Sequence, residues 1–192
     1  MILRPIGVIK KSYKHCYRAP AHIGLKLSRL NRHYRKGCVM EDKLESKVLF
    51  ELTVDLGIPH QIENTPHGNR RIFYITGGKI KGQRLSGEIL PGGSDWALFR
   101  PDGVLELDVR AVFRTDDGQL VCMYPKGLIN IPPDLLSKVR DGQPVDSSKY
   151  YFRAAYFFET SSEKYAWLNK ILAVGVLGRT TEGISGVVYE IV

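Results

Sequence analysis

No apolar run in this 192-residue chain approaches the roughly 20 residues that a helix needs to cross a bilayer. The first residues lack the apolar segment of a secretory signal peptide. Cys16, Cys38 and Cys122 are an odd number of cysteines without the spacing of a disulfide framework, which argues against a disulfide-stabilised secreted domain. These absences predict a cytoplasmic protein that makes no membrane contact.

Signatures of well-known catalytic chemistry are missing as well. Gly77 and Gly82 have the spacing of a Walker loop, but Gln83 follows where the phosphate-binding lysine is required. No G-x-G-x-x-G dinucleotide motif follows a strand-like run, and no G-x-S-x-G nucleophile elbow is present. The histidines and cysteines show none of the ligand spacings of a zinc site. We therefore expect neither a metal nor a cofactor.

Carboxylates are absent from the first 40 residues, which carry ten lysine and arginine side chains. Residues 41–192 hold the other 18 basic residues and all 20 acidic ones, so the net charge of +8 divides into +10 and −2. Any nucleic-acid contact would therefore use the N-terminal segment alone. We interpret residues 1–45 as a basic extension, either disordered or preceding a true start at Met40, and residues 46–192 as one domain.

Turn signals recur at short intervals from residue 48 onward, and the runs between them are rich in Val, Ile, Leu, Phe and Tyr. The clearest alternation is "LELDVRA" (105–111), in which the apolar residues share one face and the charged residues share the other. Short strands separated by glycine-rich turns are typical of an antiparallel sandwich or barrel. One short helix is predicted after Pro132, and a second helical turn over "SSEKYAWLN".

Charged and aromatic residues occur inside these strand-like runs in pairs that share a face. The pairs are Asp108 with Arg110 and Tyr151 with Arg153. One interpretation is a solvated outer face with weak cross-strand ion pairs. The other is a polar lining inside a barrel, where an arginine and an aspartate hold an oxygen of a ligand. The residues by themselves leave both interpretations open.

The same residues carry a family likeness. The runs "LPGGSDWALFRPDG", "YYFRAAYFFET" and "YAWLN", in this order within residues 47–192, resemble the family of domain of unknown function 3237, also called UPF 0311. The resemblance implies a mainly β protein: a single antiparallel β-barrel of the calycin or allene-oxide-cyclase type, with an internal cavity and one or two short helices. A fungal member cyclises a polyketide-derived phenol onto an alkene, which implies that such a cavity can support acid–base chemistry.

The resemblance also implies which residues form the site. The expected catalytic residues are Asp95, Asp108, Arg110, Tyr151 and Arg153. The expected ligand-binding residues are Arg71, Trp96, Tyr165 and Asn169. In this scheme the aspartates and Tyr151 move protons, the arginines stabilise an enolate or phenolate, and Trp96 and Tyr165 stack on the ligand. On the strength of the resemblance, we expect Asp108 and Arg110 to point into the barrel.

Three functions are compatible with these observations. The first is a cofactor-free cyclase or isomerase that acts on an unsaturated or aromatic metabolite. The second is a non-enzymatic carrier that uses the same cavity for a small apolar ligand. The third is nucleic-acid binding through the N-terminal extension, which would be sensitive to salt and insensitive to sequence. Each is compatible with a homo-oligomer.

The division of the chain is testable by truncation. A chain that begins at Met40 should fold and melt within about 3 °C of the full chain, because the first 40 residues offer few apolar side chains to a core. Thermal unfolding of both chains measures the difference. An insoluble shortened chain would show that the first 40 residues pack on the barrel.

Overall fold

Twelve strands and three short helical segments make up the part of the chain that the computed structural model describes, residues 43–140, 143 and 145–192. The strands are β1 (Ser46–Leu56), β2 (His60–Thr65), β3 (Gly68–Lys81), β4 (Ser86–Ile89), β5 (Ser94–Phe99), β6 (Leu105–Thr115), β7 (Leu120–Met123), β8 (Lys126–Asn130), β9 (Tyr151–Tyr156), β10 (Phe158–Glu159), β11 (Ala173–Arg179) and β12 (Gly183–Ile191). The helical segments are α1 (Pro133–Arg140), η2 (Ser147–Lys149) and η3 (Ala166–Lys170). The basic extension and any nucleic-acid binding by it lie outside the described residues.

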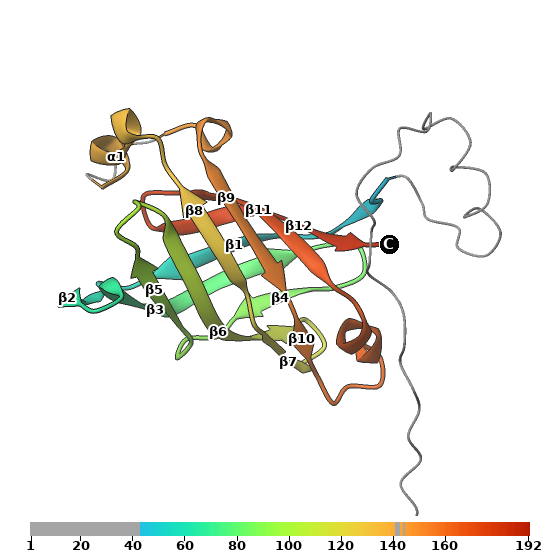
Figure 1. Ribbon diagram of the computed structural model, residues 1–192. Coiled ribbons are helices and arrows are strands. Elements are labelled where there is room, and N and C mark those ends of the chain that lie inside the picture. The colour runs from blue at the N-terminus through green and yellow to red at the C-terminus, as the bar shows by residue number, and fades with distance from the viewer. Residues whose placement is uncertain (1–42, 141–142, 144) are drawn as a thin grey trace, which may run out of the picture. The chain divides into compact units, whose positions relative to one another are not determined.

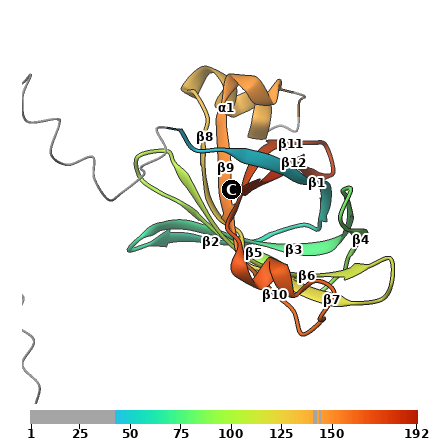
Figure 2. The ribbon, with the colours of Figure 1, turned by 90° about the vertical axis from the view of Figure 1, so that its right-hand side faces the viewer.

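The sheet closes on itself as an antiparallel barrel (Figures 1 and 2). Around the barrel the strands follow the order β6, β5, β3, β1, β12, β11, β9 and β8, and each pairs with the next in antiparallel register. The pairing of β8 with β6, from Leu105 opposite Ile129 to Asp108 opposite Lys126, completes the ring. The mainly β barrel that the sequence predicted is therefore confirmed.

The alternation in β6 has the physical origin that the sequence indicated. Leu105, Leu107, Ala111 and Phe113 are buried inside the barrel, because successive side chains of a strand point to opposite faces. The turns on either side of β6 contain Gly103 and Gly118, with φ of +86° and +84°. Positive φ is a conformation that glycine adopts without a steric penalty, so these turns form where the sequence placed them.

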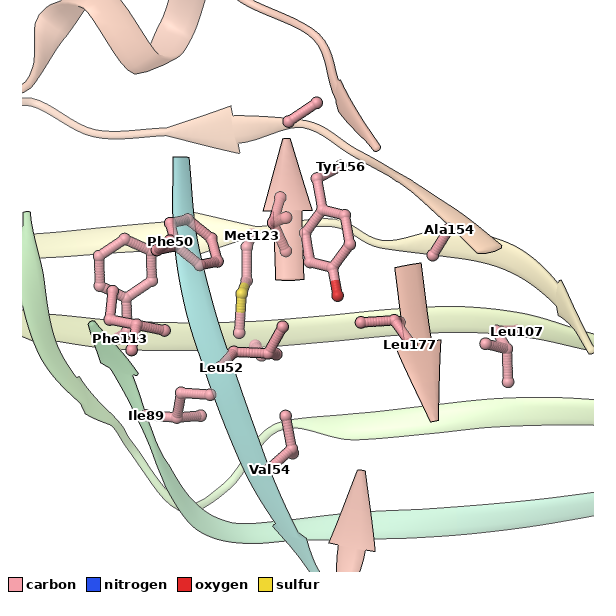
Figure 3. Packing of buried hydrophobic residues seen from close by; sticks show 14 of the residues in the cluster. Phe50, Leu52, Val54, Ile89, Leu107, Phe113, Met123, Ala154, Tyr156 and Leu177 are labelled. Atoms are coloured by element: carbon pink, nitrogen blue, oxygen red, sulfur yellow. The ribbon is translucent and has the colours of Figure 1, made fainter. Parts of the chain in front are cut away.

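One end of the barrel is filled with side chains. Phe50 packs edge-to-face against Phe113, with ring centroids 6.4 Å apart, and against Phe158, at 6.2 Å. Figure 3 shows Phe50, Phe113 and Met123 close together at this end of the core. Leu168 of η3 is fully buried, and η3 contacts β10. Dense aromatic packing therefore fills this end of the barrel.

Both predicted helices are present. α1 starts at Pro133, and Asp134 lies in its first turn. The first N–H groups of a helix have no partner within it, so a proline, which has no N–H, costs no hydrogen bond at this position. η3 lies within the run that was expected to form a helical turn. Among the helices of the described residues, none has the length and apolar character required to cross a bilayer.

The aromatic end of the core should contribute heavily to stability. Phe113→Ala should lower the free energy of unfolding by about 3–5 kcal/mol, because it leaves a cavity among fully buried side chains. Leu120→Ala is the matched control, since Leu120 is 56% exposed on the neighbouring strand, and should cost under about 0.5 kcal/mol. Urea denaturation measures both values. Equal losses of unfolding free energy in the two variants would contradict the burial of Phe113 in a packed core.

Candidate active site

A pocket of about 650 Å³ opens at the α1 end of the barrel. We call it the outer chamber. Its wall combines inward-facing side chains of the barrel with one face of α1: Arg71, Phe73, Phe99, Leu105, Ile129, Leu136 and Arg179 are among its lining residues. Most of this lining is apolar, and the two arginines supply the positive charge.

The two arginines of the outer chamber lie against aromatic rings. The guanidinium carbon of Arg71 is 4.5 Å from the centroid of the Phe99 ring, and that of Arg179 is 5.9 Å from the Phe73 centroid. Neither takes part in a salt bridge with another described residue. Burial, together with the positive charge of Arg71, lowers the pKa of Arg179 below its ordinary value. Positive charge that is held near apolar surface without a salt bridge to a carboxylate favours an anionic ligand.

A second, smaller cavity of about 40 Å³ lies deeper in the barrel. We call it the inner chamber. Successive inward residues of the same strands line the two chambers, with Phe73 followed by Ile75 on β3, and Arg179 preceded by Leu177 on β11. Two residues of a strand span about 7 Å, so the chambers are neighbours along the barrel. Leu52, Val54, Leu107, Ala154, Tyr156 and Leu177 are among the lining residues that Figure 3 shows.

Among the described residues, Asp95 is the one acidic residue that lines the inner chamber, and only 6% of its surface is exposed. Its Oδ1 accepts a hydrogen bond of 3.1 Å from the backbone N–H of Asp108, and the described residues donate no other to this carboxyl. Burial is the main cause that raises the pKa of Asp95 to about 7, and the charge of Asp108 adds to it. The hydrogen bond from Asp108 and the charge of Arg179 act in the opposite direction. A carboxyl with this pKa can both donate and accept a proton near neutral pH.

Tyr156 adds a second polar group to the inner chamber. The residue is 2% exposed, and burial raises the pKa of its hydroxyl, so the proton stays on the oxygen at neutral pH. Within the described part of the chain, no residue forms a hydrogen bond with this hydroxyl that would compete with a ligand. Tyr156 can therefore donate a hydrogen bond to a bound molecule.

Comparison with known proteins connects this geometry to a family. The model of the family described as "Protein of unknown function (DUF3237)" matches residues 44–192. The chain belongs to this family. A UPF0311 protein of Rhodopseudomonas palustris is 36% identical over 152 residues, which cover 79% of this chain and 99% of the relative. A UPF0311 protein of Clostridium acetobutylicum is 34% identical over 144 residues, which cover 74% and 91%.

Solved structures of similar proteins agree with the fold. The crystal structure of the Rhodopseudomonas palustris protein matches with a TM-score of 0.74 over 80% of this chain and all of that one. A "beta-barrel like protein" of Acinetobacter baumannii is 33% identical, with a TM-score of 0.71 over 81% of this chain and all of that one. A distant relative from Penicillium herquei, named a hydroalkoxylation enzyme, is 24% identical over 127 residues, which cover 66% of this chain and 70% of the relative.

Asp108 and Arg110 point out of the barrel, so the expectation that they face its interior is wrong. Their side chains are 49% and 56% exposed, and they form an ion pair with each other at 3.1 Å. The two-residue period of β6 explains the error, because Val109, which lies between them, lines the inner chamber. The backbone N–H of Asp108 still contributes to the site through Asp95.

Tyr151, Arg153 and Trp96 also lie outside the two chambers. Tyr151 is 51% exposed, and the guanidinium carbon of Arg153 lies 5.3 Å from its ring centroid on the outer face of β9. The inward positions of that strand belong to Phe152 and Ala154. Trp96 is 49% exposed, and its indole N–H donates to the hydroxyl of Ser94 at 3.1 Å.

Tyr165 and Asn169 serve the loop around η3, away from both chambers. Tyr165 is buried, and its hydroxyl donates to a carboxylate oxygen of Asp117 at 3.1 Å. The amide of Asn169 forms two hydrogen bonds of 2.9 Å with the backbone of Thr160. Of the nine residues expected at the site, Asp95 and Arg71 are the two that line its chambers.

Two residues of the site were missed from the sequence, Arg179 and Tyr156. The sequence pattern could have identified both. Tyr156 is two residues from Ala154 and four from Phe152, and Arg179 is two residues from Leu177, so each shares a strand face with residues that line the inner chamber. Extending the two-residue period along β9 and β11 would have placed both inside. The described residues contain no group of three or more His, Cys, Asp or Glu that could hold a metal ion.

Burial of Asp95 makes stability depend on pH. The folded-state pKa of about 7 exceeds the ordinary 3.8, so the contribution of this residue to stability is complete below pH 4 and is lost as pH rises to 7. The loss amounts to roughly 4 kcal/mol. Asp95→Asn should remove this fall and should unfold at higher urea concentration than the unmodified protein at pH 8.

The comparison needs urea denaturation at several pH values between 4 and 8. Asp116→Asn is the matched control, because Asp116 is exposed in a turn, and it should follow the unmodified profile. Parallel profiles for the unmodified protein and Asp95→Asn would show that the Asp95 carboxyl titrates as an ordinary surface group.

Proposed function

We propose that the protein is a cofactor-free enzyme that binds a small aromatic or unsaturated metabolite with an anionic oxygen and cyclises or isomerises it by proton transfer through Asp95. The observation that carries the proposal is a buried carboxyl of pKa about 7 in a chamber adjoining two arginines that have no salt bridge within the described residues. A carboxyl in such surroundings suits general acid–base catalysis.

Arg71 and Arg179 take the role of holding the anionic oxygen. Their guanidinium groups approach the outer chamber from β3 and β11, on walls that also carry Phe73 and Phe99. An enolate, phenolate or carboxylate at this position would gain charge-assisted hydrogen bonds, and its carbon skeleton would lie against the aromatic rings. The same two groups would stabilise negative charge that develops during the reaction.

The named activity of the Penicillium herquei relative supports this reaction class. Hydroalkoxylation adds the O–H of one group across a carbon–carbon double bond, so a proton must reach carbon and an oxygen must become nucleophilic. The protonated form of Asp95 is suited to give the proton, and the arginine pair is suited to stabilise the oxygen nucleophile. The product has the same composition as the substrate, so no external oxidant or reductant is needed.

A non-enzymatic carrier is the second candidate. The mostly apolar lining of both chambers favours it, because burial of a ligand there requires no proton transfer. The two functions differ in what Asp95 does. An enzyme needs its proton, whereas a carrier needs only the shape of its side chain.

Anion binding tests the shared part of both candidates. Arg179→Gln should weaken the binding of benzoate at least tenfold, because one charge-assisted hydrogen bond contributes about 1.5–3 kcal/mol. Isothermal titration calorimetry measures the affinity. Arg114→Gln is the matched control, since Arg114 is 50% exposed and pairs with Glu88 outside the barrel. Equal benzoate affinity in both variants would contradict the arginine site.

Incubation with a bacterial metabolite extract separates the enzyme from the carrier. Liquid chromatography with mass spectrometry should find a compound of unchanged mass and altered retention time after incubation with the unmodified protein. Asp95→Asn should not produce it. A compound that is retained unchanged by both proteins would favour the carrier and contradict the enzyme.

A further inference from the structure

The inner chamber has a composition that the proposed arginine site does not require. Apart from Asp95 and Tyr156, the lining is aliphatic and aromatic, and it includes Leu52, Leu107, Ala154 and Leu177. The anionic oxygen of a ligand finds its partners in the outer chamber, so what enters the inner chamber has to be apolar. Burial raises the pKa of Asp95 to about 7, and its neutral form tolerates an apolar neighbour.

The two chambers are adjacent along the barrel. Arg179 lines the outer chamber, and Leu177, two residues or about 7 Å away on β11, lines the inner one. When the carboxylate of an aromatic ring contacts the arginines in the outer chamber, a substituent opposite the carboxylate is the part of the ligand that can enter the inner chamber.

The size of the inner chamber limits what can enter. Its volume is about 40 Å³, well below the roughly 150 Å³ of a cavity that holds one benzene ring. The inner chamber can therefore take a short substituent. The chamber is too small for a second ring.

Ala154 is the residue that leaves this space open. It lies between Phe152 and Tyr156 on β9, and all three line the chamber. On the neighbouring strand, a β-carbon added to Gly127 would lie 2.7 Å from that of Ala154 and even closer to the backbone oxygen of Arg153, so Gly127 leaves the space beside Ala154 free of a side chain. A larger side chain at position 154 would extend into the chamber.

We propose that the inner chamber is a specificity subsite for a short apolar substituent on the aromatic anion, and that Ala154 sets its length limit. This inference rests on the proposed function, because the arginine pair positions the ring. It assigns the substrate class more narrowly: a ring with an acidic oxygen at one end and a short alkyl or alkenyl group opposite to it.

A series of 4-alkylbenzoates from benzoate to 4-hexylbenzoate tests the proposal by calorimetry. Affinity for the unmodified protein should rise about fourfold per carbon over the first members of the series and should fall once the chain is longer than the chamber. In the Ala154→Leu variant, affinity should no longer rise with the length of the alkyl chain. Ala155→Leu is the matched control, because Ala155 is on the outward face of the same strand, and it should keep the unmodified profile.

A second variant keeps the proposal testable if Ala154→Leu does not fold. Leu107→Ala enlarges the chamber at a lining residue of β6, two strands from Ala154 on the same wall, and should move the optimum to a longer chain. Affinity that is independent of chain length, or an identical profile in Ala154→Leu and Leu107→Ala, would overturn the subsite. Benzoate binding that depends on Arg179 would then still support the proposed function. Failure of every benzoate to bind would contradict both.

Discussion

The pairing of β6 with β8 is the constraint on which the site depends. Between Leu105 and Asp108, β6 has β8 on one side, and β5 pairs with it from Leu105 to Arg110 on the other. A closed sheet has no free edge, so the inward side chains of every strand lose water together. Asp95 faces Val109 across the β5–β6 pairing and is enclosed for this reason. In an open sheet, the same carboxyl would be hydrated and would have an ordinary pKa.

Closure also explains why the barrel differs between its two ends. Phe50, Phe113 and Phe158 fill one end, which stabilises the fold through buried apolar area and edge-to-face contacts. The two chambers instead enclose Asp95, deeper in the barrel, and Arg179, at the α1 end, and the burial of these groups without an ion pair among the described residues opposes folding. Departures from good packing at one place in an otherwise consistent fold are typical of a functional site. The stability gained by packing at the aromatic end offsets the cost of burying these two ionisable groups.

Local patterns predicted much of this molecule correctly. The turns around β6, the helix after Pro132 and the alternation of β6 all appear in the structure as the sequence indicated. The error at Asp108 and Arg110 arose because the family resemblance was given more weight than the alternation, which had already placed Leu107 and Val109 on the apolar face. A resemblance identifies residues that relatives share, but it does not state on which side of a sheet their side chains lie.

The sequence by itself determined which residues share a face, where the chain turns and to which family it belongs. These properties follow from a two-residue period and from local backbone preferences, so neighbours along the chain suffice to define them. Only the tertiary structure decided that Asp95 is buried, that Arg179 and Arg71 line one chamber, and that Ala154 leaves space beside Tyr156. These residues come from β3, β5, β9 and β11, which only the closure of the barrel brings around a common interior, and no local pattern specifies that closure.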